Sequence, residues 1–211
     1  MNRTYLPGIL AMATIVVASN ILVQFLLLDG LLTWGAFTYP FAFLVTDVMN
    51  RLYGVSAARR VVGAGFVVGV ICSLIGSQIM LQGDGYEYAA VPLRVAVGSG
   101  IAFLVAQMLD VAIFDRFRTG RWWRAPLVST VVGSAADTAL FFTIAFAAFV
   151  PFSAAANDAI SWAWDPAPFL TLGTEMPLWI TLAVADWMVK LAVALVALVP
   201  FRALTGNAHP A

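Results

Sequence analysis

Stretches of about 20 mostly apolar residues recur along the 211-residue chain, separated by short polar segments. An α-helix of about 20 residues is long enough to cross a hydrocarbon core of roughly 30 Å. Because 62% of the residues are hydrophobic and only 10% are charged, lipid rather than water is the expected solvent. The pattern therefore predicts an all-α integral membrane protein, a bundle of six transmembrane helices. Their expected ranges are 7–28, 31–50, 60–81, 93–114, 125–149 and 177–201.

Basic residues are distributed unevenly over the segments that flank these helices. With the helices placed as above, Arg94 lies on one side and all other flanking arginines lie on the opposite side: Arg3, Arg51, Arg59, Arg60, Arg116, Arg118, Arg121, Arg124 and Arg202. The positive-inside rule places the arginine-rich side in the cytoplasm, so both chain ends are expected there. Most acidic loop residues have the reverse bias, among them Asp29, Asp84, Glu87, Asp158, Asp165 and Glu175. We expect residues 1–211 to form a single transmembrane domain surrounded by the lipid bilayer.

The sequence lacks the motifs that mark several classes of function. The chain contains no GxxxxGK[ST] loop for nucleotide phosphates, and no HExxH, GxSxG or Cys/His cluster. Its only histidine, His209, lies in the tail, and the formal net charge of zero does not favour nucleic acid. Asp137 and Asp186 could in principle form an aspartyl hydrolase pair, but Lys190 would compete for Asp186. We expect no enzyme, metal, cofactor or nucleic-acid partner.

Five ionisable residues lie within the apolar segments. Charged groups at membrane depth are costly, so they usually face a bundle interior or a cavity and often have a function. They are Asp47, Asp110, Asp137, Asp186 and Lys190. Asp137 has no basic partner in its own helix and is the strongest functional candidate. Asp186 and Lys190 are four residues apart and share a helix face, so they are either a coupling pair or a structural ion pair.

Arg94 is expected at the outer end of the fourth helix. Its long side chain could reach the headgroup region, which would explain its position without a function. The other interpretation is a contact to substrate or a gate.

Polar and aromatic residues near these charges suggest a cavity. Gln107 and Asp110 are three residues apart and face the same way, while Asn20 adds an amide and Trp34 and Tyr39 add aromatic rings. Such a cavity suits a small, planar, polar ligand, although each polar residue could instead join two helices. Pro40 removes a backbone hydrogen bond from the second helix, as in the broken helices of transporters or in a simple kink.

Two further segments allow more than one interpretation. Gly65, Gly69 and Ser73 recur every four residues and let another helix approach closely. That helix belongs either to the same bundle or to a second copy in a homodimer. Residues 151–176 form a long outer segment that is either a loop anchored by tryptophans or a lid.

Several segments of the sequence resemble those of a known protein family. The most specific is TWGAFTYPFAFLVTDVMNRLYG from Thr33 to Gly54, followed by AARR from Ala57 to Arg60 and AQMLDVAIFDRFR from Ala106 to Arg118. Asp137 with Thr138, and Asp186 with Lys190, complete the pattern. The chain resembles the bacterial queuosine precursor transporters, a branch of the vitamin uptake transporter family.

This resemblance implies a multi-pass protein of the bacterial inner membrane that imports queuosine precursors, which are 7-deazaguanine bases, for salvage into queuosine of transfer RNA. In this interpretation Asp137 or Asp110 holds the base edge, and Trp34 or Tyr39 stacks on the ring. The expected substrate-binding residues are Asp137, Asp110, Gln107, Asn20, Asp47, Trp34 and Tyr39.

The alternative is a substrate-binding subunit of an energy-coupling-factor transporter. Many such subunits dock through an AxxxA stripe on the first helix. Here Ala11 is followed four residues later by Ile15, and Ala13 by Val17. The missing stripe favours a transporter that works alone.

Overall fold

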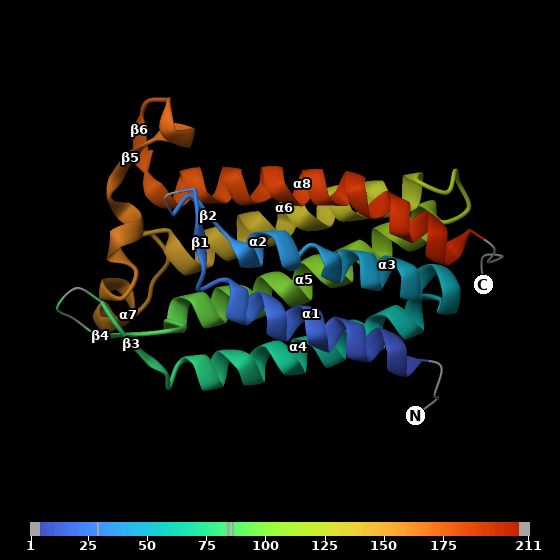
Figure 1. Cartoon of the computed structure of the whole chain (residues 1–211), viewed down its shortest axis with the longest axis horizontal. Helices are drawn as coiled ribbons and strands as arrows, with labels where there is room; N and C mark the ends of the chain where they lie inside the picture. Colours follow the sequence, from blue (N-terminus) through green and yellow to red (C-terminus); the bar gives the residue numbers. More distant parts are fainter. Residues whose placement is uncertain (1–4, 29, 84, 86, 207–211) are drawn as a thin grey trace.

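Long, nearly parallel helices dominate this computed structural model, which describes residues 5–28, 30–83, 85 and 87–206 (Figure 1). Arg3, Asp29, Asp84 and His209, which entered the sequence argument, lie outside the described residues. The helices are α1 Leu6–Leu22, α2 Trp34–Thr38, α3 Phe41–Tyr53, α4 Val55–Gly76, α5 Leu93–Phe117, α6 Arg124–Phe146, α7 Ala154–Asp158 and α8 Leu178–Thr205.

Among the described residues, four helices are long and apolar enough to cross a membrane, namely α4, α5, α6 and α8. Helix α1 is apolar but has only 17 residues, and the second expected helix is divided into α2 and α3. The class of helical membrane protein is therefore confirmed. The count of six crossings stays a prediction.

The division of the second helix follows from Pro40, which has no N–H to donate. Ala42 N donates to Tyr39 O at 2.9 Å, and Phe43 N donates to Pro40 O at 3.1 Å, so tighter three-residue turns cross the break. At the start of α2, the Thr33 side chain accepts a hydrogen bond from Ala36 N. Tyr39 consequently lies at the junction of two helices rather than within one.

Several helix ends differ from those expected. Helix α1 ends at Leu22 rather than at residue 28, and the apolar residues beyond it form a ribbon of β1 Leu26–Leu27 and β2 Leu32–Thr33. Helix α4 begins at Val55 and ends at Gly76, five residues earlier than expected at each end, because Gly54 at φ 81° separates it from α3. Hydropathy does not distinguish the last turn of a helix from an apolar ribbon at its end.

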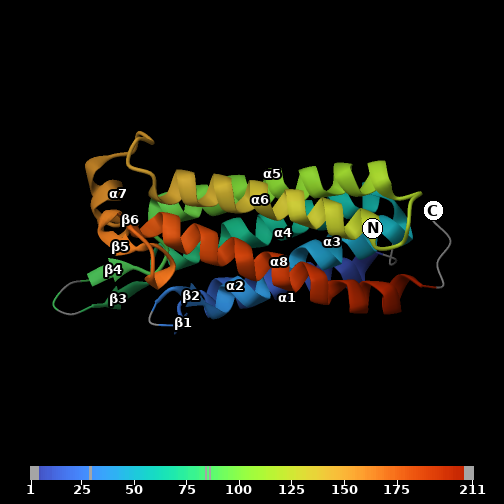
Figure 2. The ribbon, with the colours of Figure 1, turned by 90° about the horizontal axis from the view of Figure 1, so that it is seen from above.

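Two more ribbons lie beside the β1–β2 ribbon at one end of the bundle (Figures 1 and 2). They consist of β3 Met80–Gln82 with β4 Glu87–Ala89, and β5 Pro166–Pro168 with β6 Glu175–Pro177. The start of α1, the end of α8 and the α3–α4 and α5–α6 connections lie at the opposite end. We call these the ribbon end and the arginine end.

The outer segment 151–176 is folded rather than an open loop. It contains α7, the 3-10 turns η2 Ser161–Trp164 and η3 Phe169–Thr171, and β5. Ile160 and Ala163 are buried against α6 and α8, and Trp164 Nε1 donates to Phe146 O at 2.6 Å. The segment covers the ribbon end of these helices, and its function as a lid is untested.

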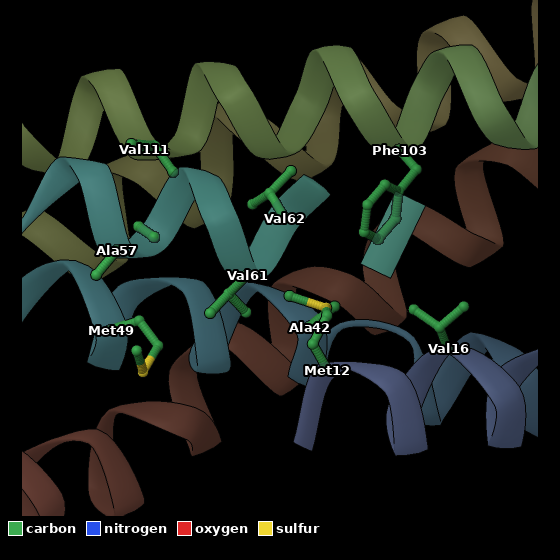
Figure 3. Packing of buried hydrophobic residues seen from close by; sticks show 10 residues of the cluster. Met12, Val16, Ala42, Met49, Ala57, Val61, Val62, Phe103 and Val111 are labelled. Atoms are coloured by element: carbon green, nitrogen blue, oxygen red, sulfur yellow. The ribbon is translucent and has the colours of Figure 1, made fainter. Parts of the chain in front are cut away.

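Apolar packing joins α1, α3, α4 and α5 around Met12, Val61 and Phe103 (Figure 3). A Cβ atom at Gly65 would lie 2.6 Å from Met12 Cγ, and one at Gly69 would lie 3.6 Å from Val16 Cγ1. The small-residue stripe therefore packs on α1 of the same chain. A homodimer through Gly65, Gly69 and Ser73 stays a prediction that these contacts do not require.

The membrane orientation that the distribution of arginine residues predicts can be tested by inserting reporter domains. Alkaline phosphatase, which folds only outside the cytoplasm, is expected to be active when inserted after Leu172 and inactive when inserted after Gly120. Green fluorescent protein, which fluoresces when it folds in the cytoplasm, should give the opposite result at both positions. Active phosphatase at Gly120 would contradict the predicted orientation.

Candidate functional site

A charged group of residues, which we call the central cluster, lies between α6, α8 and the α2–α3 junction. It consists of Tyr39, Asp137, Thr138, Asp186 and Lys190. Lys190 Nζ lies 2.7 Å from Asp137 Oδ2 and 2.6 Å from Asp186 Oδ2, so one ammonium group is shared by two carboxylates. The residues come together because Asp186 and Lys190 share a face of α8 and Asp137 faces them from α6.

Hydroxyl groups complete the central cluster. Tyr39 Oη donates to Asp137 Oδ1 at 2.9 Å, and Thr138 Oγ1 donates to Asp186 Oδ2 at 2.9 Å. Lys190 also lies 2.9 Å from Thr138 Oγ1 and 5.5 Å from the centre of the Tyr39 ring. The side chains of Lys190 and Asp137 are 4% and 5% exposed, whereas that of Asp186 is 15% exposed. Charges buried this deeply persist only when they are paired and hydrogen-bonded.

A second group, the inner cluster, joins α3, α5 and α6 nearer to the arginine end. Its members are Thr46, Asp47, Gln107, Asp110, Ser129 and Thr130, all of them buried. Ser129 Oγ donates to Asp47 Oδ1 at 3.1 Å and Thr130 Oγ1 donates to Asp47 Oδ2 at 3.2 Å. Thr46 Oγ1 lies 2.6 Å from Gln107 Oε1.

The two clusters lie about one helical turn apart. A Cβ atom at Gly133 would lie 3.3 Å from Asp110 Cβ, which places Gly133 opposite the inner cluster. Asp137 follows Gly133 by one turn of α6, or about 6 Å along the helix axis. A narrow pocket reaches Asp47 and Thr130 between α3, α6 and α8, with Leu44, Leu198 and Phe201 in its wall.

The structure brings together most of the residues predicted for the site. Tyr39, Asp137, Asp186 and Lys190 meet in the central cluster, and Asp47, Gln107 and Asp110 meet in the inner cluster. Their part in binding substrate stays a prediction.

Two predicted residues lie apart from both clusters. Asn20 Nδ2 donates to Val16 O of its own helix at 2.8 Å. Trp34 is 50% exposed and its ring contact is with Phe37. Sequence position gives the depth of these side chains but not the direction in which each one points around its helix.

Serine and threonine residues were not among the predicted site residues, although Thr138, Ser129 and Thr130 contact the carboxylates directly. Serine and threonine are common in membrane helices, where they also bond to their own backbone. A signal was nevertheless present, because Ser129, Thr130, Gly133 and Asp137 follow one face of α6 at spacings of three and four residues.

Arg94 is fully buried rather than extended out of the bundle, so the expectation of a snorkelling side chain was wrong. Its guanidinium donates to Ile144 O at 3.0 and 3.3 Å, to Ala147 O at 2.8 Å and to Asn157 Oδ1 at 2.8 Å. It also lies 4.9 Å from the centre of the Phe152 ring. Arg94 satisfies carbonyl groups that the end of α6 leaves free and attaches the outer segment to α5.

Long apolar helices around two buried polar clusters define a multi-pass membrane protein of the transporter class. Residues 33–205 match the family model described as "Putative vitamin uptake transporter". Because this match covers most of the chain, the protein belongs to the vitamin uptake transporter family.

The chain is also similar to three curated bacterial proteins. It is 38% identical over 141 residues to the "Queuosine precursor transporter" of Escherichia coli, which covers 63% of this chain and 64% of that protein. It is 38% identical over 121 residues to the "Probable queuosine precursor transporter" of Haemophilus influenzae, covering 54% and 52%. A protein of the same name from Bacillus subtilis is 26% identical over 180 residues, covering 79% and 68%.

The alignments span about half to two thirds of the length of these relatives. No solved structure matches the chain. With these relatives, the long apolar helices place the chain in the bacterial inner membrane as a multi-pass protein.

The role of Arg94 in joining α5, α6 and the outer segment predicts a loss of stability on substitution. In Arg94→Lys a single ammonium group replaces the planar fork that contacts two carbonyls and Asn157. We expect about 2–4 kcal/mol of destabilisation, since buried carbonyl groups lose charged donors. Thermal unfolding of the detergent-solubilised protein measures it.

Arg202→Lys is the matched control, because Arg202 is an exposed residue that lies over the Trp122 ring at the other end of the bundle. It should change stability by no more than about 0.5 kcal/mol. An equal effect of both substitutions would contradict the proposed role of Arg94.

Proposed function

We propose that this chain is a transporter that imports queuosine precursors across the bacterial inner membrane, and that its substrates are 7-deazaguanine bases destined for salvage into transfer RNA queuosine. The observation that carries the proposal is the similarity to proteins named queuosine precursor transporters. The chemistry of the central cluster supports it independently.

A 7-deazaguanine base presents two adjacent donors, the ring N–H and the exocyclic amine, beside an oxo acceptor. One carboxylate accepts both donors in a bidentate manner, and an ammonium group donates to the oxo oxygen. Asp137 and Lys190 supply this pair of groups at 2.7 Å from each other. We therefore assign the base edge to Asp137 rather than to Asp110, and the oxo group to Lys190.

Because Lys190 is shared by two carboxylates, the exchange of Asp137 from Lys190 to the base costs little free energy. When the base takes Asp137, Lys190 keeps its contact with Asp186 and with Thr138. No buried charge then loses all its partners, which would cost several kcal/mol. In this proposal Asp186 and Lys190 are a holding pair for the substrate-free state.

Tyr39 supplies the aromatic surface in this proposal. Its ring makes edge contacts with Phe43 and Phe103 at 6.4 and 6.2 Å between centroids. A planar base gains from stacking on such a ring. Because Tyr39 lies at the α2–α3 break, the ring can move with the short helix α2 to admit the base.

Replacing Asp137 tests the assignment. Asp137→Asn keeps the shape but removes the charge that accepts both donors, so we expect uptake of a labelled 7-deazaguanine base to fall at least about 100-fold. Uptake is measured in cells that can neither make nor import these bases, together with the queuosine content of their transfer RNA.

Ser134→Ala is the control on the same helix, since the one hydrogen bond of the buried Ser134 hydroxyl within the described residues is to Val131 O of α6. It should reach the membrane and import base at close to the unaltered rate. Rescue of queuosine by the chain alone would also exclude a binding subunit that needs a separate ATPase complex. Normal uptake by Asp137→Asn would contradict the assignment.

A further inference from the structure

The inner cluster contains a carboxyl group with no donor. Asp110 is fully buried, and within the described part of the chain neither of its oxygens has a hydrogen-bond partner. No lysine or arginine of that part lies within ion-pair distance of Asp47 or Asp110. The groups with which the Asp110 carboxyl interacts electrostatically are the Asp47 carboxyl and the Ser129 hydroxyl.

Two buried carboxyl groups in contact cannot both be ionised without a positive charge between them. No charged neighbour described on the packed elements forms an ion pair with either carboxyl group, although Arg51 attracts Asp47 electrostatically. On α3, Arg51 follows Asp47 by one turn, but its guanidinium lies over the rings of Phe114 and Phe201 and donates to Arg118 O. On α8, Lys190 is held by Asp137 and Asp186.

Helix α6 provides hydroxyl groups to the inner cluster, while its first residue, Arg124, lies over the Phe117 ring. Ser129 and Thr130 of this helix donate hydrogen bonds to the Asp47 carboxyl group. These hydroxyl groups are neutral and do not balance a second negative charge, so the two carboxyl groups hold one proton between them.

We propose that Asp47 and Asp110 share one exchangeable proton and that movement of this proton drives import of the base. The proposal rests on the transport function above and separates two roles, because the central cluster binds the base while the inner cluster carries the proton.

The surroundings favour a proton over a metal ion. Among the described residues, no group of three or more histidine, cysteine or carboxylate side chains is placed to hold a metal ion. The nearby Gln107 presents a buried amide nitrogen that has no hydrogen-bond partner in the same part of the chain, and an amide N–H is a donor and not a metal ligand. A proton needs only the two facing carboxyl groups.

In this proposal the proton leaves by the narrow pocket that reaches Asp47 and Thr130 between α3, α6 and α8. Beyond it lies the arginine end, which is predicted to face the cytoplasm. In one transport cycle the pair takes a proton from the outer side together with the base and returns it to the cytoplasm. The pair holds its proton on the inward step, while it is buried. When the bundle then opens to the cytoplasm, water solvates both carboxylates, so both can ionise and the pair releases one proton for each base.

The test uses the purified full-length chain in liposomes with a radiolabelled 7-deazaguanine base. With the outside one pH unit more acidic and the membrane potential clamped, symport of one proton should accumulate the base about tenfold. Asp110→Asn cannot exchange the proton, so accumulation should fall to a ratio near one. Exchange of labelled for unlabelled base across the membrane needs no net proton movement. Its rate in Asp110→Asn should therefore stay within about threefold of the rate in the unaltered chain.

Asp115→Asn is the matched control, because Asp115 is an exposed residue of α5 that pairs with Arg118. It should accumulate the base as the unaltered chain does. Should Asp110→Asn fail to fold, Asp47→Asn takes its place with the same expected loss, and Asp110→Glu should retain accumulation.

Each remaining outcome has a definite meaning. Accumulation driven by a sodium gradient in place of the pH gradient, or full accumulation by Asp110→Asn, overturns the proton pair. Loss of exchange together with accumulation in a well-folded Asp110→Asn places this residue in the base site and overturns it as well. Absence of exchange in the unaltered chain would instead overturn the transport function itself.

Discussion

The sharing of one ammonium group by two carboxylates is the interaction on which this membrane core depends. Lys190 contacts Asp137 and Asp186 at 2.7 and 2.6 Å, and without it both acids would be buried in hydrocarbon surroundings with only hydroxyl partners. The shared ammonium also ties α8 to α6 and, through Tyr39, to the α2–α3 junction. A polar network of this kind rigidifies a bundle when all its members are paired.

The sequence predicted the charged core well because each acid in an apolar run must face away from lipid. Asp137, Asp186 and Lys190 were found in this way, and so were Asp47 and Asp110. Direction around a helix was less predictable, since Asn20 bonds to its own helix and Trp34 faces outward. The pairing of Asp137 with Lys190 could be found only from the structure, because it depends on how α6 packs on α8. Local sequence patterns carry no information about that packing.

The helix boundaries were likewise predictable where a local residue determines them, and not predictable where the tertiary structure does. Pro40 predicted a break that the structure contains between Thr38 and Phe41, because the missing N–H acts locally. The end of α1 at Leu22 was not predictable, since an apolar ribbon follows it directly. Arg94 was misjudged because its carbonyl partners come from α6, about 50 residues later in the chain.

The tight pairing of α5 with α6 also constrains how such a bundle can move. A Cβ atom at Gly98 or Gly133 would lie 3.3 Å or less from the facing helix or from Phe43, and Arg94 fastens the far end of the pair to the outer segment. These two helices and their cap therefore form one closely packed wall, which carries Asp110 and Asp137. The α2–α3 break, with its short helix and its proline, lies on the opposite side of the clusters and carries Tyr39 and Asp47. The packing of this scaffold is thus asymmetric, with regular helix pairing on one side of the polar interior and an interrupted helix on the other.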